Sequence, residues 1–95
     1  MTMTTILAAG TNAAPSTDVV VNALESLSVS IFSPTEKAGI GQPFEVVQVT
    51  PGATNHVCYL DNATRQTTIN GPITIRVLRP DLGVGAVAFG VFTEV

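Results

Sequence analysis

Hydrophobic and polar residues alternate with a period of two along several short segments of the chain. The clearest case is LESLSVSIFS, residues 24–33, in which Leu27, Val29 and Ile31 fall on one face and the intervening serines on the other. Successive side chains of a strand point to opposite faces of a sheet, so this pattern predicts a strand with one buried and one wet side. The segment ITIRVLR, residues 73–79, alternates in the same way and predicts a second such strand.

Shorter apolar segments predict the remaining strands, and turn-forming residues separate them. No segment is convincingly helical, and six to eight strands at roughly ten-residue spacing are typical of an all-β fold. We expect a small antiparallel β-sandwich, either Ig-like or jelly-roll-like, with an extended N-terminal arm or edge strands over residues 1–23 and the sandwich domain over 24–95. Besides the two strands within 24–33 and 73–79, the predicted strands are 4–10, 18–23, 44–49, 56–60, 67–70 and 86–95. The longest predicted loop is 34–43.

The apolar C-terminal segment is predicted to be a strand with two different faces. In AVAFGVF, residues 86–92, Val87, Phe89 and Val91 point one way, whereas the other face carries Phe92 and otherwise only alanine and glycine. The bulky face is expected to complete the core of the domain, because burying such side chains contributes several kcal/mol. The small face permits close approach of another sheet or subunit.

The composition supports the same fold class and points to a partner. The 95 residues suffice for one domain, and thirteen valines, thirteen threonines and six isoleucines favour pleated sheet over helix. Hydrophobic residues make up 45% of the chain and charged residues only 12%, with a mean hydropathy of +0.42. A surface with so few charges on a small domain indicates a partner that covers part of it.

Charge and cysteine content exclude several classes of protein. The net charge is −3, and Lys37, Arg65, Arg76 and Arg79 form no basic run, so we expect no nucleic-acid partner. No apolar run reaches the ~18–20 residues of a membrane span, and the first ten residues lack the pattern of a secretory signal. The lone Cys58 excludes an internal disulfide, which indicates folding in a reducing cytoplasm.

His56 and Cys58 are the residues that most resemble a reactive pair, since their spacing predicts a shared face of one strand. A zinc site needs further nitrogen or sulfur ligands, and the chain has no other His or Cys. A Cys–His nucleophile needs an orienting third group. The favoured interpretation is an ordinary strand with a small buried thiol. Asn62, Ala63 and Thr64 match the acceptor pattern for N-glycosylation, but the predicted turn at Asp61 and Asn62 is enough to account for these residues. We predict no catalytic, cofactor or metal site, and no enzyme.

Both ends of the chain resemble the ends of small virion proteins of tailed bacteriophages, of the head decoration or cement type. The resemblance rests on INGPITIRVLRPDLGVGAVAFGVFTEV at the C-terminus and on TTILAAGTNAAPSTDVVV near the N-terminus, about half of the chain. The chain departs from that pattern at residues 73–75, where Ile-Thr-Ile stands in place of the usual Gly-Thr-Tyr. The resemblance implies an oligomeric protein of the virion, assembled in the host cytoplasm, that binds the major capsid protein and stabilises the capsid lattice.

Two alternatives to capsid decoration stay open at this stage. The first is a tail, vertex or head-fibre component of the virion, and the second is a glycan-binding adhesin module. For a partner interface, including self-association as a homo-oligomer, the sequence points to apolar residues of the N-terminal segment, two arginines of residues 73–79 and one aromatic of the last strand. The predicted interface residues are Ile6, Leu7, Val19, Val20, Val21, Arg76, Arg79 and Phe92.

Overall fold

The computed structural model describes residues 3–34 and 42–95, and every described element is a β-strand. The predicted loop 34–43 lies mostly outside the described residues, as do the first two residues of the predicted arm. The strands are β1 (Met3–Gly10), β2 (Ala14–Pro15), β3 (Val19–Val21), β4 (Ser26–Phe32), β5 (Phe44–Thr50), β6 (Ala53–Leu60), β7 (Gln66–Asn70), β8 (Ile73–Arg79) and β9 (Phe89–Glu94).

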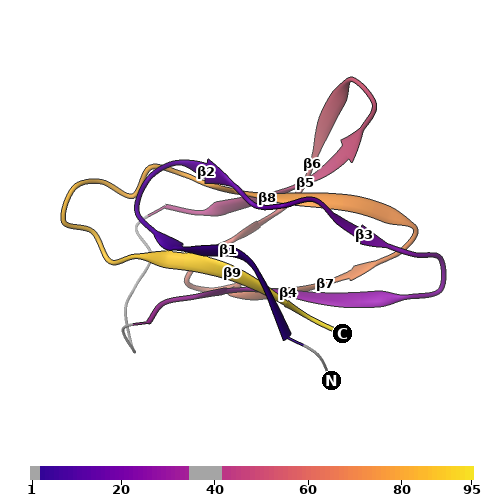
Figure 1. Cartoon of the computed structure of the whole chain (residues 1–95), viewed down its shortest axis with the longest axis horizontal. Helices are drawn as coiled ribbons and strands as arrows, with labels where there is room; N and C mark the ends of the chain where they lie inside the picture. Colours follow the sequence, from indigo (N-terminus) through magenta and orange to yellow (C-terminus); the bar gives the residue numbers. More distant parts are fainter. Residues whose placement is uncertain (1–2, 35–41) are drawn as a thin grey trace.

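Two antiparallel sheets face each other, which confirms the predicted β-sandwich (Figure 1). One sheet, called sheet A, has the order β1-β9-β4-β7, and the other, sheet B, has the order β2-β8-β5-β6 with β3 also paired to β8. The first strand pairs with the last, β2 and β3 with β8, β4 with β7, and β5 with β6. This nested pairing is that of a long hairpin rolled into two layers, so the fold is a jelly roll rather than an Ig-like sandwich.

The core lies between the sheets and is filled by aliphatic and aromatic side chains from both. The inward positions of the alternating segments supply it as predicted: Val29 and Ile31 of β4, and Ile75 and Val77 of β8, are buried. The largest fully buried side chains are Phe44, Phe89, Leu60, Ile75, Val29, Val46, Val77 and Val91.

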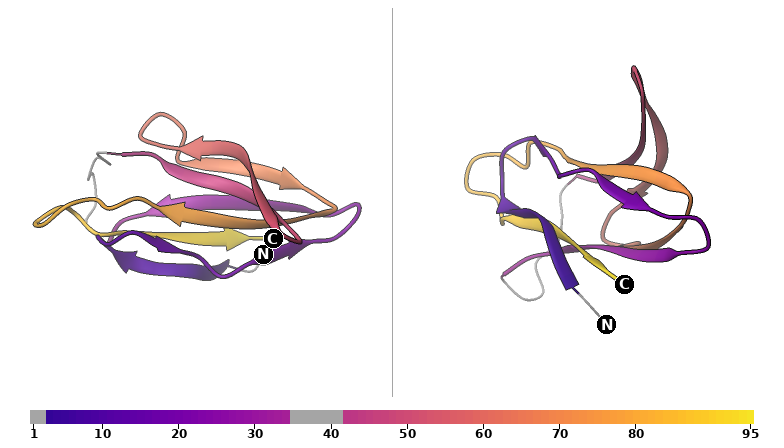
Figure 2. Two further views of the ribbon diagram at one scale, coloured as in Figure 1. Left: turned by 90° about the horizontal axis from the view of Figure 1, so that it is seen from above. Right: turned by 45° about the vertical axis from the view of Figure 1, so that its right-hand side comes forward.

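The N-terminal segment forms edge strands of the sandwich. Strand β1 pairs with β9 in sheet A, and β2 and β3 pair with β8 in sheet B, so residues 3–21 contribute to both layers (Figures 1 and 2). Ile6 and Val21 belong to the same hydrophobic core as Phe89. Residues 3–21 and the rest of the described chain therefore share a single core.

Strand β9 is shorter than the predicted strand over 86–95. It begins at Phe89 because residues 83–88 form a turn and an irregular segment, in which Gly83 and Gly85 adopt positive φ angles. The predicted inward positions Phe89 and Val91 are confirmed as core residues, whereas Val87 is 38% exposed and lies outside the strand.

The outer part of the β5–β6 hairpin stands away from the two layers (Figures 1 and 2). Its residues 51–57 are all exposed. Within this hairpin Val46 lies opposite Cys58 but Val47 lies opposite His56, so Val57 is an extra residue in β6. This is a β-bulge, and it moves the side chains before it to the other face of the sheet.

Candidate functional site

The surface best suited to bind another macromolecule lies on the outer face of sheet A. Met3 and Thr5 of β1, Phe92 of β9 and Phe32 of β4 line a shallow hollow of about 300 Å3 there. Met3 is 62% exposed, and the two phenylalanines are half-buried. Among the described residues, none that lines the hollow is charged.

The strand register explains why two phenylalanines meet at this place. Phe92 lies opposite Ser30 of β4 and Thr5 of β1, and Phe32 lies opposite Gly90. The rings of Phe32 and Phe92 are therefore diagonal neighbours across two strands, with centroids 5.9 Å apart and planes tilted by 56°. A tilted aromatic pair at this distance is a favourable geometry.

Gly90 makes room for this arrangement. A Cβ at Gly90 would lie 2.8 Å from Cε1 of Phe32 and 2.5 Å from the main-chain oxygen of Leu7. The missing side chain thus lets the Phe32 ring lean over β9 and lets the bulged strand β1 approach closely. The neighbours that approach Gly90 belong to β1 and β4 of the same sheet, so close approach of another sheet or subunit to this side of the last strand stays a prediction.

The remaining predicted interface residues do not join Phe92 on this surface. Val20 is 66% exposed on sheet B, the opposite layer, while Leu7 and Val19 are half-buried and pack against the core. Ile6 and Val21 are themselves core residues. Partner contact through exposed residues stays a prediction, but these buried side chains stabilise the domain itself, a role that the interface prediction did not foresee.

Arg79 is also buried, with 8% of its surface exposed, and it links the two sheets. Its guanidinium donates hydrogen bonds to the main-chain oxygens of Asn12 at 2.7 Å, Ala8 at 2.8 Å and Phe89 at 3.0 Å. Ala8 and Phe89 belong to sheet A, whereas Arg79 ends β8 of sheet B. Arg79 thus has a structural role between the layers, which its prediction as a partner-interface residue did not foresee.

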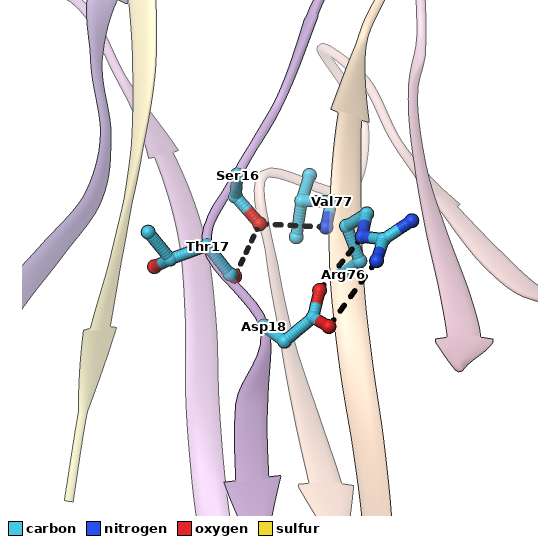
Figure 3. A network of polar contacts seen from close by, with 5 residues as sticks. All are labelled: Ser16, Thr17, Asp18, Arg76 and Val77. Atoms are coloured by element: carbon cyan, nitrogen blue, oxygen red, sulfur yellow. Dashed lines mark hydrogen bonds and ion pairs between the residues drawn. The ribbon is translucent and has the colours of Figure 1, made fainter. Parts of the chain in front are cut away.

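Arg76 lies on the outer face of sheet B and forms an ion pair within the chain. Its Nε and Nη2 atoms donate to the two carboxylate oxygens of Asp18 at 2.7 and 3.1 Å (Figure 3). The hydrogen bond from Arg76 holds the pKa of the Asp18 carboxyl below its ordinary value, and the carboxylate raises the pKa of the guanidinium. Arg76 also lines a second hollow of about 460 Å3 together with Pro15 and Leu78.

Ser16 bonds to β8 in the gap between β2 and β3, beside this ion pair. The N–H of Ser16 donates to the main-chain oxygen of Val77 at 2.8 Å. The N–H of Val77 donates to Oγ of Ser16 at 2.9 Å (Figure 3). The N–H of Thr17 turns instead to the other sheet and donates to the main-chain oxygen of Ile6 at 3.1 Å. The hydroxyl of Ser16 therefore replaces the main-chain partner that Val77 lacks where β2 and β3 separate.

The predicted shared face of His56 and Cys58 is wrong, because the bulge at Val57 separates them. Nδ1 of His56 lies 2.8 Å from Oε2 of Glu45 on the outer face of sheet B, and its ring centroid lies 4.5 Å from that of Tyr59. Cys58 packs against the core instead. Burial raises the pKa of its thiol, and a hydrogen bond with Thr67 partly opposes this effect.

The described residues offer no further constellation of reactive groups. Within 3–34 and 42–95, no three side chains among His, Cys, Asp and Glu gather closely enough to hold a metal ion. The same ranges contain no helix long and apolar enough to cross a membrane.

Comparison of the chain with protein-family models, with curated proteins and with solved structures finds no match.

The interpretation of the sequence missed Met3, Thr5 and Phe32 as lining residues of the hollow. The signal for Phe32 was present, because continuing the alternation of residues 24–33 places this aromatic on the same wet face as the serines. Met3 and Thr5 could not be found in this way. They reach the hollow only because the first strand pairs with the last, a long-range contact that periodicity does not encode.

Proposed function

We propose that this chain is a structural protein that docks onto a larger protein assembly through the outer face of sheet A. The observation that carries the proposal is the hollow around the Phe32–Phe92 pair, whose described lining residues carry no charge, together with the exposed Met3. Aromatic side chains anchor many protein interfaces, and the buried cores of interfaces are enriched in aromatic residues and methionine and depleted in charged residues.

The assembly that we propose is the capsid lattice of a tailed bacteriophage, with the chain acting as a head decoration or cement protein. This step rests on the resemblance of the two chain ends to such proteins. Jelly rolls serve in viral capsids but also in lectins and cupins, so the fold supports a capsid role without selecting it. The proposal includes a location in the virion, the major capsid protein as partner, association into homo-oligomers and a role without catalysis.

The other exposed apolar side chains support a surface that is covered in the assembled state. They occur on both sheets and at loop tips, including Leu24 in the turn before β4 and Val84 between Gly83 and Gly85. Single exposed apolar residues are common on monomers, but here they coincide with a charged fraction of only 12%. The exposed large apolar residues are Met3, Val20, Leu24, Val57, Tyr59, Val84, Val87 and Val95.

Copy number in purified particles tests the proposal. The amount of this chain relative to the major capsid protein is measured by quantitative mass spectrometry of virions from the phage that encodes it. A ratio of about one, or a simple fraction of one, is expected for lattice decoration. A handful of copies per particle would instead support the tail, vertex or head-fibre alternative, and absence from particles would overturn a virion role.

A pair of variants tests the binding face. Phe92→Ser should abolish rebinding to particles stripped of this chain, because it removes one ring of the aromatic pair from the hollow. Thr54→Ala changes an exposed residue of β6 in the opposite sheet and should leave rebinding unchanged. Circular dichroism of both variants verifies that the sandwich remains folded. Equal loss of binding in the two variants would contradict docking through sheet A.

A further inference from the structure

The described strands give the sandwich four sheet edges, and three of these carry features that hinder pairing with another strand. Strand β1 has two register shifts against β9, and β6 has the bulge at Val57. The edge formed by β2 and β3 is interrupted between Pro15 and Val19 and ends its first piece in proline. Bulges, breaks and prolines are the usual means by which sheet edges avoid association.

Strand β7 has none of these features within the described chain. It pairs with β4 in an unbroken register, from Ser26 opposite Asn70 to Ser30 opposite Gln66. Its sequence, QTTIN, contains no proline and no charged residue. As the last strand in the order of sheet A, it pairs with no other described strand along its second edge.

One hydrogen bond shows which main-chain groups of β7 face this open edge. The N–H of Ile31 donates to the main-chain oxygen of Arg65 at 2.9 Å, and these residues lie opposite each other when the β4–β7 register is extended by one position. Hydrogen-bonded and non-hydrogen-bonded pairs alternate along an antiparallel ladder. The N–H and C=O groups of Gln66, Thr68 and Asn70 therefore point away from β4, toward the open edge.

We propose that β7 pairs antiparallel with β7 of a second copy of this chain across a twofold axis at Thr68. In this register Thr68 faces the partner's Thr68, and Gln66 faces the partner's Asn70. The main-chain groups of these three residues that point away from β4 then meet each other as hydrogen-bonded pairs. Sheet A continues from one copy into the next, and the interface uses the same strand of both copies, as closed twofold symmetry requires.

The side chains of β7 complement themselves in this register. The outer face pairs one hydroxyl with another at Thr68 and one amide with another at Gln66, and both kinds of pair are favourable across antiparallel strands. Gln66, Thr68 and Asn70 are all exposed in the single chain, so a second copy can reach them. No like charges are brought opposite each other, because the strand carries none.

This inference is independent of the proposed docking on a capsid. It concerns a different part of sheet A, and it is tested with the purified full-length chain alone. A dimer in solution would establish it even if the chain were absent from particles.

Cysteine substitutions on a Cys58→Ser background test the register. The Cα atoms of a hydrogen-bonded antiparallel pair lie about 5.5 Å apart, within the ~4.4–6.8 Å that a disulfide spans. Thr68→Cys alone should form a disulfide-linked dimer under mild oxidation. A mixture of the Gln66→Cys and Asn70→Cys chains should form the mixed dimer, whereas either chain alone should react no faster than a Thr54→Cys control on the exposed edge strand β6.

Sedimentation of the chain from about 10 µM to about 1 mM tests the association without a covalent link. The weight-average mass should rise toward that of a dimer. Thr68→Lys places two like charges opposite each other at the axis, so it should weaken dimerisation at least about tenfold, while Thr54→Lys should not. A mass that stays monomeric throughout, or Thr68→Cys chains that cross-link no faster than the Thr54→Cys control, would overturn the proposal.

Discussion

Arg79 and Phe89 join the two sheets through a hydrogen bond of 3.0 Å from Nη1 of the guanidinium to the main-chain oxygen. The same nitrogen donates to Ala8, and Nε donates to Asn12, so the one side chain satisfies three main-chain oxygens. Among the described carboxylates none forms an ion pair with Arg79. A buried cation without a carboxylate is rare, and its hydrogen bonds to main-chain oxygens are what makes its burial tolerable.

Arg79→Met should destabilise the protein strongly. The substitution keeps much of the side-chain volume but leaves three main-chain oxygens without their donor, so we expect a loss of roughly 3–5 kcal/mol in the free energy of unfolding. Arg79→Lys restores the charge but not the forked geometry and should recover only part of that loss. Urea denaturation measures both variants. A loss below about 0.5 kcal/mol for Arg79→Met would show that these hydrogen bonds do not hold the layers together.

Ser16→Ala should destabilise the protein by about 1–3 kcal/mol, because the N–H of Val77 would lose its acceptor in a buried position. Ser26→Ala is the matched control. Its hydroxyl donates to Asn70 at 2.6 Å but is exposed, so the change should stay within about 0.5 kcal/mol. Both values come from urea denaturation followed by circular dichroism. Equal effects of the two substitutions would contradict the bridging role of Ser16 at the strand break.

The fold class could be predicted from the sequence because it depends on local alternation. The pattern of Leu27, Val29 and Ile31 against serines, and the turn residues between segments, are consequences of strands with one buried face. The choice between a jelly roll and an Ig-like sandwich could not be made, because it depends on which strands pair. The pairing of Met3 with Glu94 joins residues at opposite ends of the chain, and no periodicity reports it.

The candidate site was predictable only in part, for two physical reasons. Phe92 was placed on the outer face by its alternation with core residues, which strand geometry enforces. The bulge at Val57 could not be foreseen, and one extra residue was enough to move His56 and Cys58 to opposite faces. The alternation of residues 73–79 distinguishes the two arginines, because Arg79 is in phase with the buried Ile75 and Val77, whereas Arg76 falls on the outer face. What alternation does not supply is the hydrogen-bond acceptors of Arg79, since Ala8 and Asn12 reach it only through the path of β1 and the segment after it.

The Asp18–Arg76 pair should make stability depend on pH in the acid range. The pKa of Asp18 lies below its ordinary value of 3.8 in the folded chain, because Arg76 donates a hydrogen bond to the carboxylate. The unfolded chain therefore binds a proton first as the pH falls. The stabilisation is present above pH 3.8 and is lost as the pH falls through the lower, folded-state pKa.

Comparison of the wild-type chain with Asp18→Asn measures this contribution. The difference in free energy of unfolding should be constant near neutral pH, favour the wild type, and shrink as the pH falls below 3.8. Because both side chains are partly exposed, added salt should reduce the difference at neutral pH. A difference that grows toward low pH would contradict the assigned direction of the pKa shift.

Gly90→Ala should both destabilise the domain and disturb the hollow on sheet A. The added Cβ would lie 2.5 Å from the main-chain oxygen of Leu7 and 2.8 Å from the Phe32 ring, so β1 or the ring must move. We expect a loss of about 1–3 kcal/mol in the free energy of unfolding, as for other insertions into a packed position.

Gly52→Ala is the control, because the added Cβ meets no atom within 4 Å and the substitution carries only the strain of a φ angle of 82°. It should cost about 1–2 kcal/mol and leave the hollow unchanged. Chemical shifts of the Phe32 and Phe92 ring protons distinguish the two cases. They should change in Gly90→Ala and not in Gly52→Ala, and unchanged shifts in both would mean that Gly90 does not shape the aromatic pair.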